Sequence, residues 1–161
     1  MRRFAKLSAA ILTQSHLFVS FKITKGPTHD VCEAPTVLRD AHRRVRFATG
    51  LLDKGYDSES LLRLVVEELG AKAVIPARKN YRNPRRWPKT PHRRRMWRNF
   101  DAEAYRQRPQ IECVFSRCKR KMGSSLRAKK WAGQQREIAL RVLTHNLMIL
   151  RHHPNLFDRA G

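Results

Sequence analysis

Asp53 stands where a side chain could do chemistry. It ends the apolar run in the stretch LLDKGYDSES, residues 51–60, although the chain as a whole carries a formal net charge of +22. If that run is a buried strand of an open α/β sheet, Asp53 lies at the carboxyl edge, where such sheets bind ligands. The structural alternative is an aspartate that caps the next helix. The stretch alone leaves both interpretations open.

A second group of polar residues follows about fifty positions later, with the spacing Tyr105-x2-Arg108-x3-Glu112-x6-Lys119. At 100° per residue, an ideal helix would hold the four side chains within about 60° of one another. Pro109 favours a helix that begins at its own position, which would leave Tyr105 and Arg108 before the helix. Glu112 and Lys119 would still share a face. A lone glutamate among cations can equally be an ion-pair partner.

Residues 78–98 carry ten Lys and Arg, three prolines and no acidic residue. No hydrophobic period fits them, so we predict a loop or extended segment. Arginines interleaved with aromatic rings suit phosphate contacts and base stacking, although a solvated basic loop has the same composition. The arginines singled out as DNA-binding candidates are Arg85, Arg86 and Arg94, and the interleaved aromatic residues are Tyr81, Trp87 and Trp97.

The overall composition points to a polyanionic partner. In 161 residues, 35 Lys and Arg face 13 Asp and Glu, and the pI is about 11.4. Nucleic acid is the default partner of such a chain, and an anionic membrane surface is the second candidate. No stretch is long and apolar enough to span a membrane. Three cysteines without zinc-like spacing indicate reduced cytosolic thiols.

The elements expected to position these residues form one α/β domain over residues 1–161. Residues 5–25 predict a strand pair, and residues 34–45 a short helix. The strand 45–53 ends at Asp53, and a helix over 57–72, capped by Asp57 or Ser58 and ended by Gly70, leads to a strand over 73–76. A helix is expected within 101–122. The last helix, 135–153, is expected to close the core; its repeated leucines are Leu140, Leu143, Leu147 and Leu150.

With these residues in place, the chain resembles the DDE-type transposases of bacterial and archaeal insertion sequences. The spacing Tyr105-x2-Arg108-x3-Glu112-x6-Lys119 matches their Y-R-E-K signature, and DKGYDSE, residues 53–59, is similar to the segment that holds their second catalytic aspartate. Residues 6–30 resemble their first strand pair. The resemblance implies a ribonuclease H-like fold, with a central mixed sheet and flanking helices, and the cleavage and transfer of DNA strands.

The resemblance also implies roles for individual residues. Asp53 and Glu112 would be catalytic ligands of two Mg²⁺ or Mn²⁺ ions, one activating the nucleophile and the other stabilising the leaving oxygen. Arg108 and Lys119 would hold the DNA near the scissile phosphate, supported by Tyr105. The implied partners are the transposon ends and the target DNA, with a homo-oligomer as a further possibility and no membrane. The implied location is the prokaryotic cytoplasm, in association with the nucleoid.

Leu12 departs from the family pattern. It fills the place of the first catalytic aspartate, at the end of the first strand and shortly before Ser15-His16. A leucine side chain has no ligand atom for a metal. Asp30 and Asp57 are the nearest acids to the two strand ends and the first candidates for a replacement ligand. We therefore expect the C-terminal part of a transposase, truncated at its N-terminus and impaired in activity.

Two other classes of function remain open. The chain could be a non-catalytic DNA-binding remnant, or an inhibitor that binds an intact transposase. A basic structural or ribosome-associated protein is the third class, and the Y-R-E-K spacing argues against it. A nicking assay with Mg²⁺ or Mn²⁺ beside a gel shift distinguishes a catalytic transposase from a non-catalytic DNA-binding chain.

Overall fold

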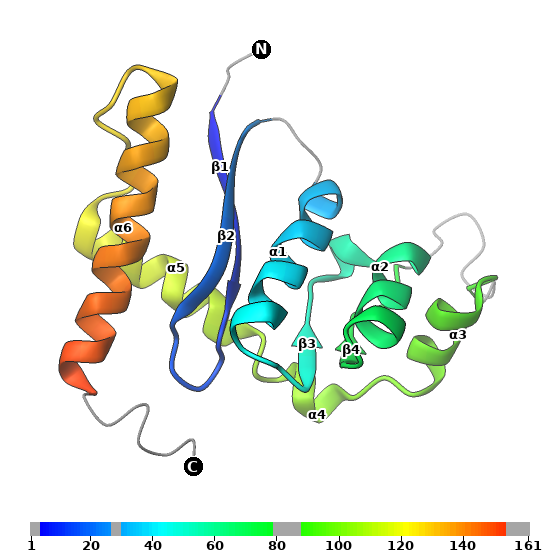
Figure 1. The fold of residues 1–161 in the computed structure, drawn as a ribbon. Coiled ribbons are helices and arrows are strands. Elements are labelled where there is room, and N and C mark those ends of the chain that lie inside the picture. Colours follow the sequence, from blue (N-terminus) through cyan, green and yellow to red (C-terminus); the bar gives the residue numbers. More distant parts are fainter. Residues whose placement is uncertain (1–3, 27–29, 79–87, 154–161) are drawn as a thin grey trace. The chain divides into compact units, whose positions relative to one another are not determined.

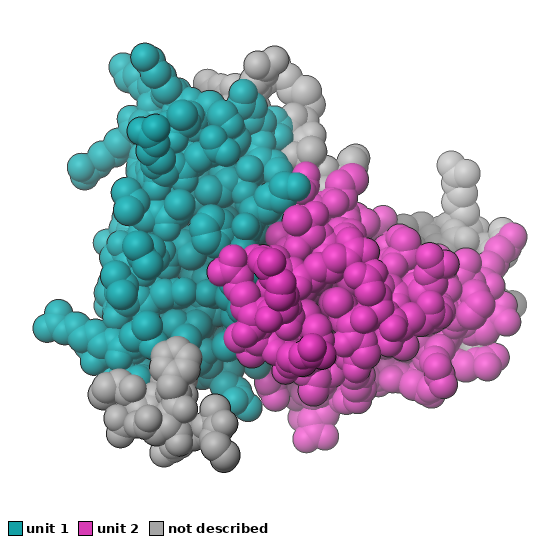
Figure 2. All heavy atoms as spheres, in the orientation of Figure 1, with its two compact units in different colours: residues 1–28, 109–161 teal, residues 29–108 magenta. Residues whose placement is uncertain are grey.

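The computed structural model describes residues 4–26, 30–78 and 88–153. The chain divides into two compact units (Figure 2): unit 1 comprises residues 1–28 and 109–161, and unit 2 comprises residues 29–108. Each unit combines helices with a two-stranded sheet (Figure 1), which confirms the predicted α/β class. The central mixed sheet, the ribonuclease H-like arrangement and the single domain stay predictions. No helix among the described residues is long and apolar enough to cross a membrane.

Unit 1 begins with the predicted hairpin. Strands β1 (Ala5–Ile11) and β2 (Phe18–Lys25) pair antiparallel, and the register shifts between Ala10 and Ile11. The connection is a tight turn in which the Leu12 N–H donates to the Leu17 carbonyl at 3.0 Å. His16 lies in this turn at φ 62°, a left-handed conformation that side chains other than glycine adopt only with support from their surroundings.

Helices α5 (Pro109–Met122) and α6 (Trp131–His152) complete unit 1. Their core contains Phe18, Val114 and Val142, and two polar side chains of α6 attach the hairpin to the helix. Asn146 makes reciprocal 2.9 Å hydrogen bonds with the N–H and carbonyl of Phe18. The buried His145 ring donates from Nε2 to the His16 carbonyl at 2.9 Å. The bond from His145 thus holds the backbone of the left-handed His16.

The prediction that the repeated leucines of the last helix face the core is wrong. Leu140, Leu143 and Leu147 are 53–60% exposed. The buried residues of α6 lie on the opposite side of the helix; they are Ile138, Val142, His145 and Ile149. The physical reason is that His145 and Asn146 bond the hairpin backbone, and these two residues fix which side of the helix turns inward.

This orientation of α6 predicts a contrast between two neighbouring aliphatic residues. Ile149→Ala should lower the free energy of unfolding by about 2–5 kcal/mol, because Ile149 is buried and its loss leaves a cavity. Leu147→Ala, on the exposed face, should change it by less than about 0.5 kcal/mol. Urea unfolding followed by circular dichroism measures both, and equal destabilisation by the two substitutions would show that the leucine face is buried.

Unit 2 contains the predicted strand–helix–strand unit, although its elements differ in length from the prediction. Helix α1 runs over Asp30–Arg44, and the short strands β3 (Thr49–Leu51) and β4 (Lys72–Val74) pair in parallel. Between the strands, α2 (Glu59–Arg63) continues into a π-helical turn, Leu64–Glu68. The Ser58 hydroxyl accepts the Leu61 N–H and caps α2. Gly70, at φ 62°, follows the helix, as predicted.

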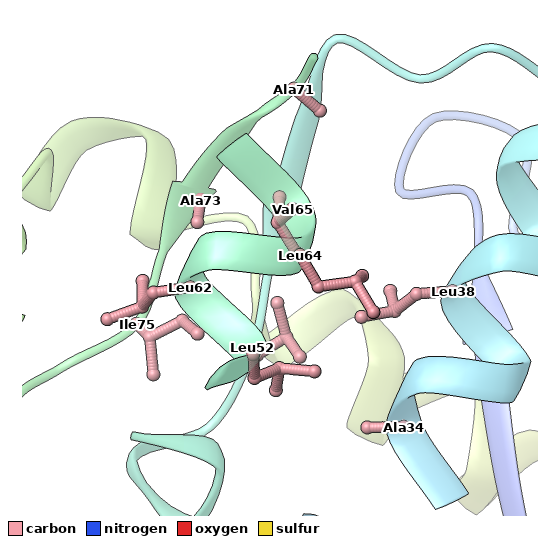
Figure 3. Packing of buried hydrophobic residues seen from close by; sticks show 10 residues of the cluster. Ala34, Leu38, Leu52, Leu62, Leu64, Val65, Ala71, Ala73 and Ile75 are labelled. Carbon is pink, nitrogen blue, oxygen red and sulfur yellow. The ribbon is translucent and has the colours of Figure 1, made fainter. Parts of the chain in front are cut away.

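The core of unit 2 forms between these elements. Leu61, Leu62, Val65 and Ile75 are at most 1% exposed, and Figure 3 shows Leu64 reaching toward Leu38 of α1. The parallel pairing continues past β3, because the Leu52 N–H donates to the Val74 carbonyl at 3.1 Å. Asp53 thus follows directly after the last residue bonded to the neighbouring strand. Helices α3 (Pro91–Arg98) and α4 (Ala102–Tyr105) complete the unit.

Candidate active site

Asp53 lies two residues after the end of β3, close to the predicted strand end, and its backbone begins the 3-10 turn Lys54–Tyr56. Its carboxylate makes no capping hydrogen bond to that turn, so the helix-capping alternative does not account for this side chain. The side chain is 47% exposed, and Oδ2 lies 3.2 Å from Nη2 of Arg108. A half-exposed carboxylate beside a guanidinium can exchange this partner for a metal ion or another cation.

Arg108 is the second predicted residue that the structure brings to this place. It lies in the turn after α4, and its N–H donates to the Tyr105 carbonyl at 3.0 Å. The Tyr105 ring packs against Phe100 with centroids 5.4 Å apart. Asp53, Tyr105 and Arg108 all belong to unit 2. Tyr105 therefore supports Arg108 through the backbone of the turn.

Glu112 and Lys119 both lie on α5, which begins at Pro109 as expected. Glu112 is in the first turn of the helix and Lys119 in the last, and both side chains are exposed. Val114 of the same helix is completely buried. As Pro109 indicates, no single helix carries all four residues: Tyr105 and Arg108 precede α5, and Glu112 and Lys119 lie on it. That Asp53 and Glu112 bind the same metal ions stays a prediction.

Leu12 immediately follows β1, in the tight turn of the hairpin. Its carbonyl accepts the His16 N–H at 2.8 Å. The His16 ring lies at hydrogen-bonding distance, 3.1 Å, from Oε1 of Gln110 in the first turn of α5. Within unit 1 the turn that holds Leu12 is thus connected to the helix end that holds Glu112.

Asp57 is not available as a replacement metal ligand. Its side chain is 2% exposed, and both oxygens accept hydrogen bonds from the Arg93 guanidinium, at 2.8 and 2.7 Å. Oδ2 also accepts the Arg78 N–H at 2.8 Å. The hydrogen bonds that Arg93 donates to Asp57 raise the pKa of Arg93 against the opposing effect of burial. The side chain of Asp30, the other candidate, lies outside the described residues.

Helix α3 contradicts the prediction that residues 78–98 are a loop or extended segment throughout. Pro91 begins the helix and Thr90 precedes it. The Thr90 side chain makes no capping hydrogen bond, and the first turn contains no acidic residue. Glu59 caps the helix from α2, accepting the N–H groups of His92 and Arg93 at 3.0 and 3.1 Å. Partners more than 30 residues away in sequence therefore stabilise a helix that local pattern does not predict.

The pKa of Glu59 is strongly lowered. Burial acts to raise its pKa, but hydrogen bonds from the start of α3, among them the two amides and the His92 ring at 2.8 Å, outweigh burial and lower the pKa to about 2. Because the folded pKa lies below the unfolded value of 4.5, the cap stabilises the fold fully above pH 4.5. This stabilisation is lost as the pH falls through about 2.

A carboxyl titration followed by ¹³C NMR checks this assignment. We expect a midpoint near 2 for Glu59, accompanied by acid-induced shifts of the His92 and Arg93 amide resonances. His92→Ala should raise the midpoint only in part, because the two backbone donors remain. A midpoint near 4.5 in the wild-type chain would show that Glu59 does not cap α3.

The predicted DNA-binding arginines divide between described and undescribed parts of the chain. Arg94 is exposed on α3, and its guanidinium donates to the carbonyls of Pro88 and Lys89 at 3.2 and 3.4 Å. Arg85 and Arg86 lie outside the described residues. Sequence reasoning missed Arg93 and Glu59, since nothing in the pattern indicates that they pair with partners so far along the chain.

The donor atoms present suit a hard cation only in part. Asp53 and Glu112 offer carboxylate oxygens, the ligands that Mg²⁺ prefers. Among the described residues, no group of three or more His, Cys, Asp or Glu side chains could together hold a metal ion. All three cysteines are free, and burial raises the pKa of the Cys118 thiol. Asp53 and Glu112 therefore remain the two candidate carboxylates.

Comparison with known protein families identifies a relationship over most of the chain. The family model described as a transposase DDE domain matches residues 2–147. No curated protein and no solved structure matches the chain. The matched range includes Asp53, Arg108 and Glu112.

Proposed function

The chain belongs to the family of transposase DDE domains, and we propose that it acts on DNA in transposition, with Asp53 and Glu112 as its metal-binding carboxylates. The observation that supports this best is Asp53 itself. It follows Leu52, the last residue bonded to the neighbouring strand of the parallel pair, and it is half-exposed, with its carboxylate not used to cap the following turn. A side chain placed in this way is accessible to a ligand at the carboxyl edge of the sheet.

The proposed metals are two Mg²⁺ or Mn²⁺ ions. When bound, they would activate the attacking hydroxyl and stabilise the leaving oxygen of the phosphodiester. Asp53 and Glu112 would contribute the carboxylate ligands, and the DNA phosphate would complete the shell. The two residues provide the oxygen donors that this chemistry requires.

Arg108 connects metal binding to DNA binding. Its 3.2 Å pair with Asp53 balances the charge of the carboxylate. When the carboxylate binds a cation, the guanidinium can turn to a phosphate, which it binds through two parallel N–H groups. Lys119, exposed on α5 together with Glu112, would contact the same DNA as a point charge. Tyr105 keeps Arg108 in place through the turn.

We propose further that the chain is impaired in cleavage by itself, because Leu12 occupies the place of the first aspartate. The hydrocarbon side chain lies in the turn connected to the start of α5. Asp57 is held by Arg93 and cannot replace it. The second candidate function, a non-catalytic DNA-binding protein or an inhibitor of an intact transposase, is favoured by the same two observations.

A nicking assay with Mn²⁺, run beside a gel shift on the same supercoiled DNA, tests the proposal. The chain should shift the DNA and produce little or no nicking. Failure to shift DNA at low salt would refute the DNA-binding role. Nicking that Glu112→Gln abolishes would support the carboxylate assignment and refute the proposed impairment.

A further inference from the structure

The carboxylates of Asp57 and Glu59 attach the basic helix α3 to the rest of unit 2. Asp57, buried, forms a bidentate ion pair with Arg93 of α3, with distances of 2.7 and 2.8 Å. Asp57 also accepts the Arg78 N–H. The side chain of Arg78 in turn donates to the carbonyls of Lys54, at 3.0 Å, and of Gly55. The turn that begins at Asp53 is therefore joined to α3 through Asp57.

Glu59 makes the second attachment. Its two carboxylate oxygens accept the N–H groups of His92 and Arg93, which have no partner within the first turn of a helix. A negative charge at this end also interacts favourably with the helix dipole. The His92 ring extends the contact, with Nδ1 at 2.8 Å from Glu59 and Nε2 at 3.1 Å from Glu67.

Helix α3 needs such attachments to persist. It has only eight residues, PHRRRMWR, of which four are arginines and none is buried. Helices this short are marginal in water, and like charges three or four positions apart destabilise them. Met96, which packs against the core of unit 2, provides the apolar contact. The ion pair of Arg93 and the cap of Glu59 supply what the local sequence lacks.

The same attachments determine which arginines face outward. Arg94 and Arg95 are exposed, and on a helix they lie 100° and 200° around the axis from Arg93. Trp97 is 44% exposed on the same helix. We propose that Asp57 and Glu59 are positioning residues, which hold α3 as a preformed basic helix so that Arg94 and Arg95 contact DNA phosphates. This inference rests on the proposed DNA-binding function.

Loss of the Asp57 charge should change DNA affinity in the direction opposite to a simple charge effect. Asp57→Asn removes a negative charge from a chain of net charge +22, and by electrostatics alone it should tighten DNA binding. If Asp57 positions α3, the same substitution weakens binding. Arg94 and Arg95 are then no longer held in place beforehand, and the entropy cost of ordering them is added to the binding step. The direction of the change therefore separates the two explanations.

Fluorescence anisotropy with a short duplex at low salt measures the change. Asp57→Asn should weaken binding about tenfold, the cost of ordering two long side chains. Asp40→Asn is the matched control: it removes the same charge from a carboxylate that pairs with Arg43 and Arg44 on α1, and it should leave binding unchanged or slightly tighter. Binding by Asp57→Asn that is as tight as by the control would overturn the proposal.

A double substitution distinguishes positioning from general damage to the fold. Arg94→Gln with Arg95→Gln should weaken binding and reduce the salt slope by about two in the wild-type background, but should add little in the Asp57→Asn background. Additive losses would contradict the proposal. If Asp57→Asn fails to fold, Glu59→Gln replaces it, because that variant keeps the buried ion pair and removes the charged cap.

Hydrogen exchange of the α3 amides separates this inference from the proposed function. If the wild-type chain binds no DNA, the proposed function fails. The attachment itself is then tested by protection of the α3 amides, which should be present in the wild type and lost in Asp57→Asn. Unprotected α3 amides in the folded wild-type chain would refute the attachment whatever the DNA result.

Discussion

Duplex DNA is expected to bind this chain with an affinity that falls about 10³- to 10⁵-fold between 50 and 200 mM salt. The reason is the concentration of 19 Lys and Arg between residues 78 and 130, against three acidic residues. Each phosphate that such a side chain neutralises releases condensed counterions, and six to ten contacts produce a loss of this size. The expected partner is therefore bound mainly through its backbone.

A salt series followed by fluorescence anisotropy measures this slope. Arg95→Gln, which removes one exposed cation of α3, should reduce the slope of log affinity against log salt by about 0.9. A random-sequence duplex of equal length should show nearly the same slope as the transposon-end duplex. An affinity that does not change with salt would exclude a phosphate-dominated interface.

The second large effect concerns the position of the first aspartate. Leu12→Asp should tighten Mn²⁺ binding about tenfold or more, since the number of charged ligands determines the affinity of an oxygen site. The turn around Leu12 is joined through His16 and Gln110 to the end of α5 that carries Glu112. The new carboxylate is therefore added within unit 1, at the end of β1.

Calorimetry on the wild type and three variants decides this prediction. The wild type should bind Mn²⁺ weakly, Leu12→Asp more tightly, and Leu12→Asp with Asp53→Asn weakly again. Leu12→Asn is the matched control, because it introduces the same shape without the charge and should bind as the wild type does. Equal affinities of the Asp and Asn variants would show that position 12 does not belong to the metal site.

Local sequence predicts the elements that short-range chemistry determines. The apolar run before Asp53, the cap at Ser58 and the left-handed Gly70 locate the strand–helix–strand unit, because hydrophobic period and turn residues specify them directly. Pro109 likewise marks the start of α5. Short-range signals of this kind are enough to assign Asp53 to the end of a strand and Glu112 to the first turn of a helix.

Long-range polar contacts explain what the sequence does not predict. The leucines of α6 have the spacing of a buried face, yet His145 and Asn146 turn the opposite stripe inward through bonds to the hairpin. Helix α3 forms in a segment rich in arginine and proline because Asp57 and Glu59 neutralise and cap it. In each case the deciding partner lies tens of residues away and leaves no periodic signal.

Paramagnetic broadening by Mn²⁺ in a ¹H–¹⁵N spectrum tests whether Asp53 and Glu112 bind the same metals. If they do, the amides around Asp53 and those around Glu112 should broaden together at the same Mn²⁺ concentration. Asp53→Asn and Glu112→Gln should each abolish the broadening at both places. Broadening at one place without the other, or broadening that neither substitution affects, would contradict the shared metal site.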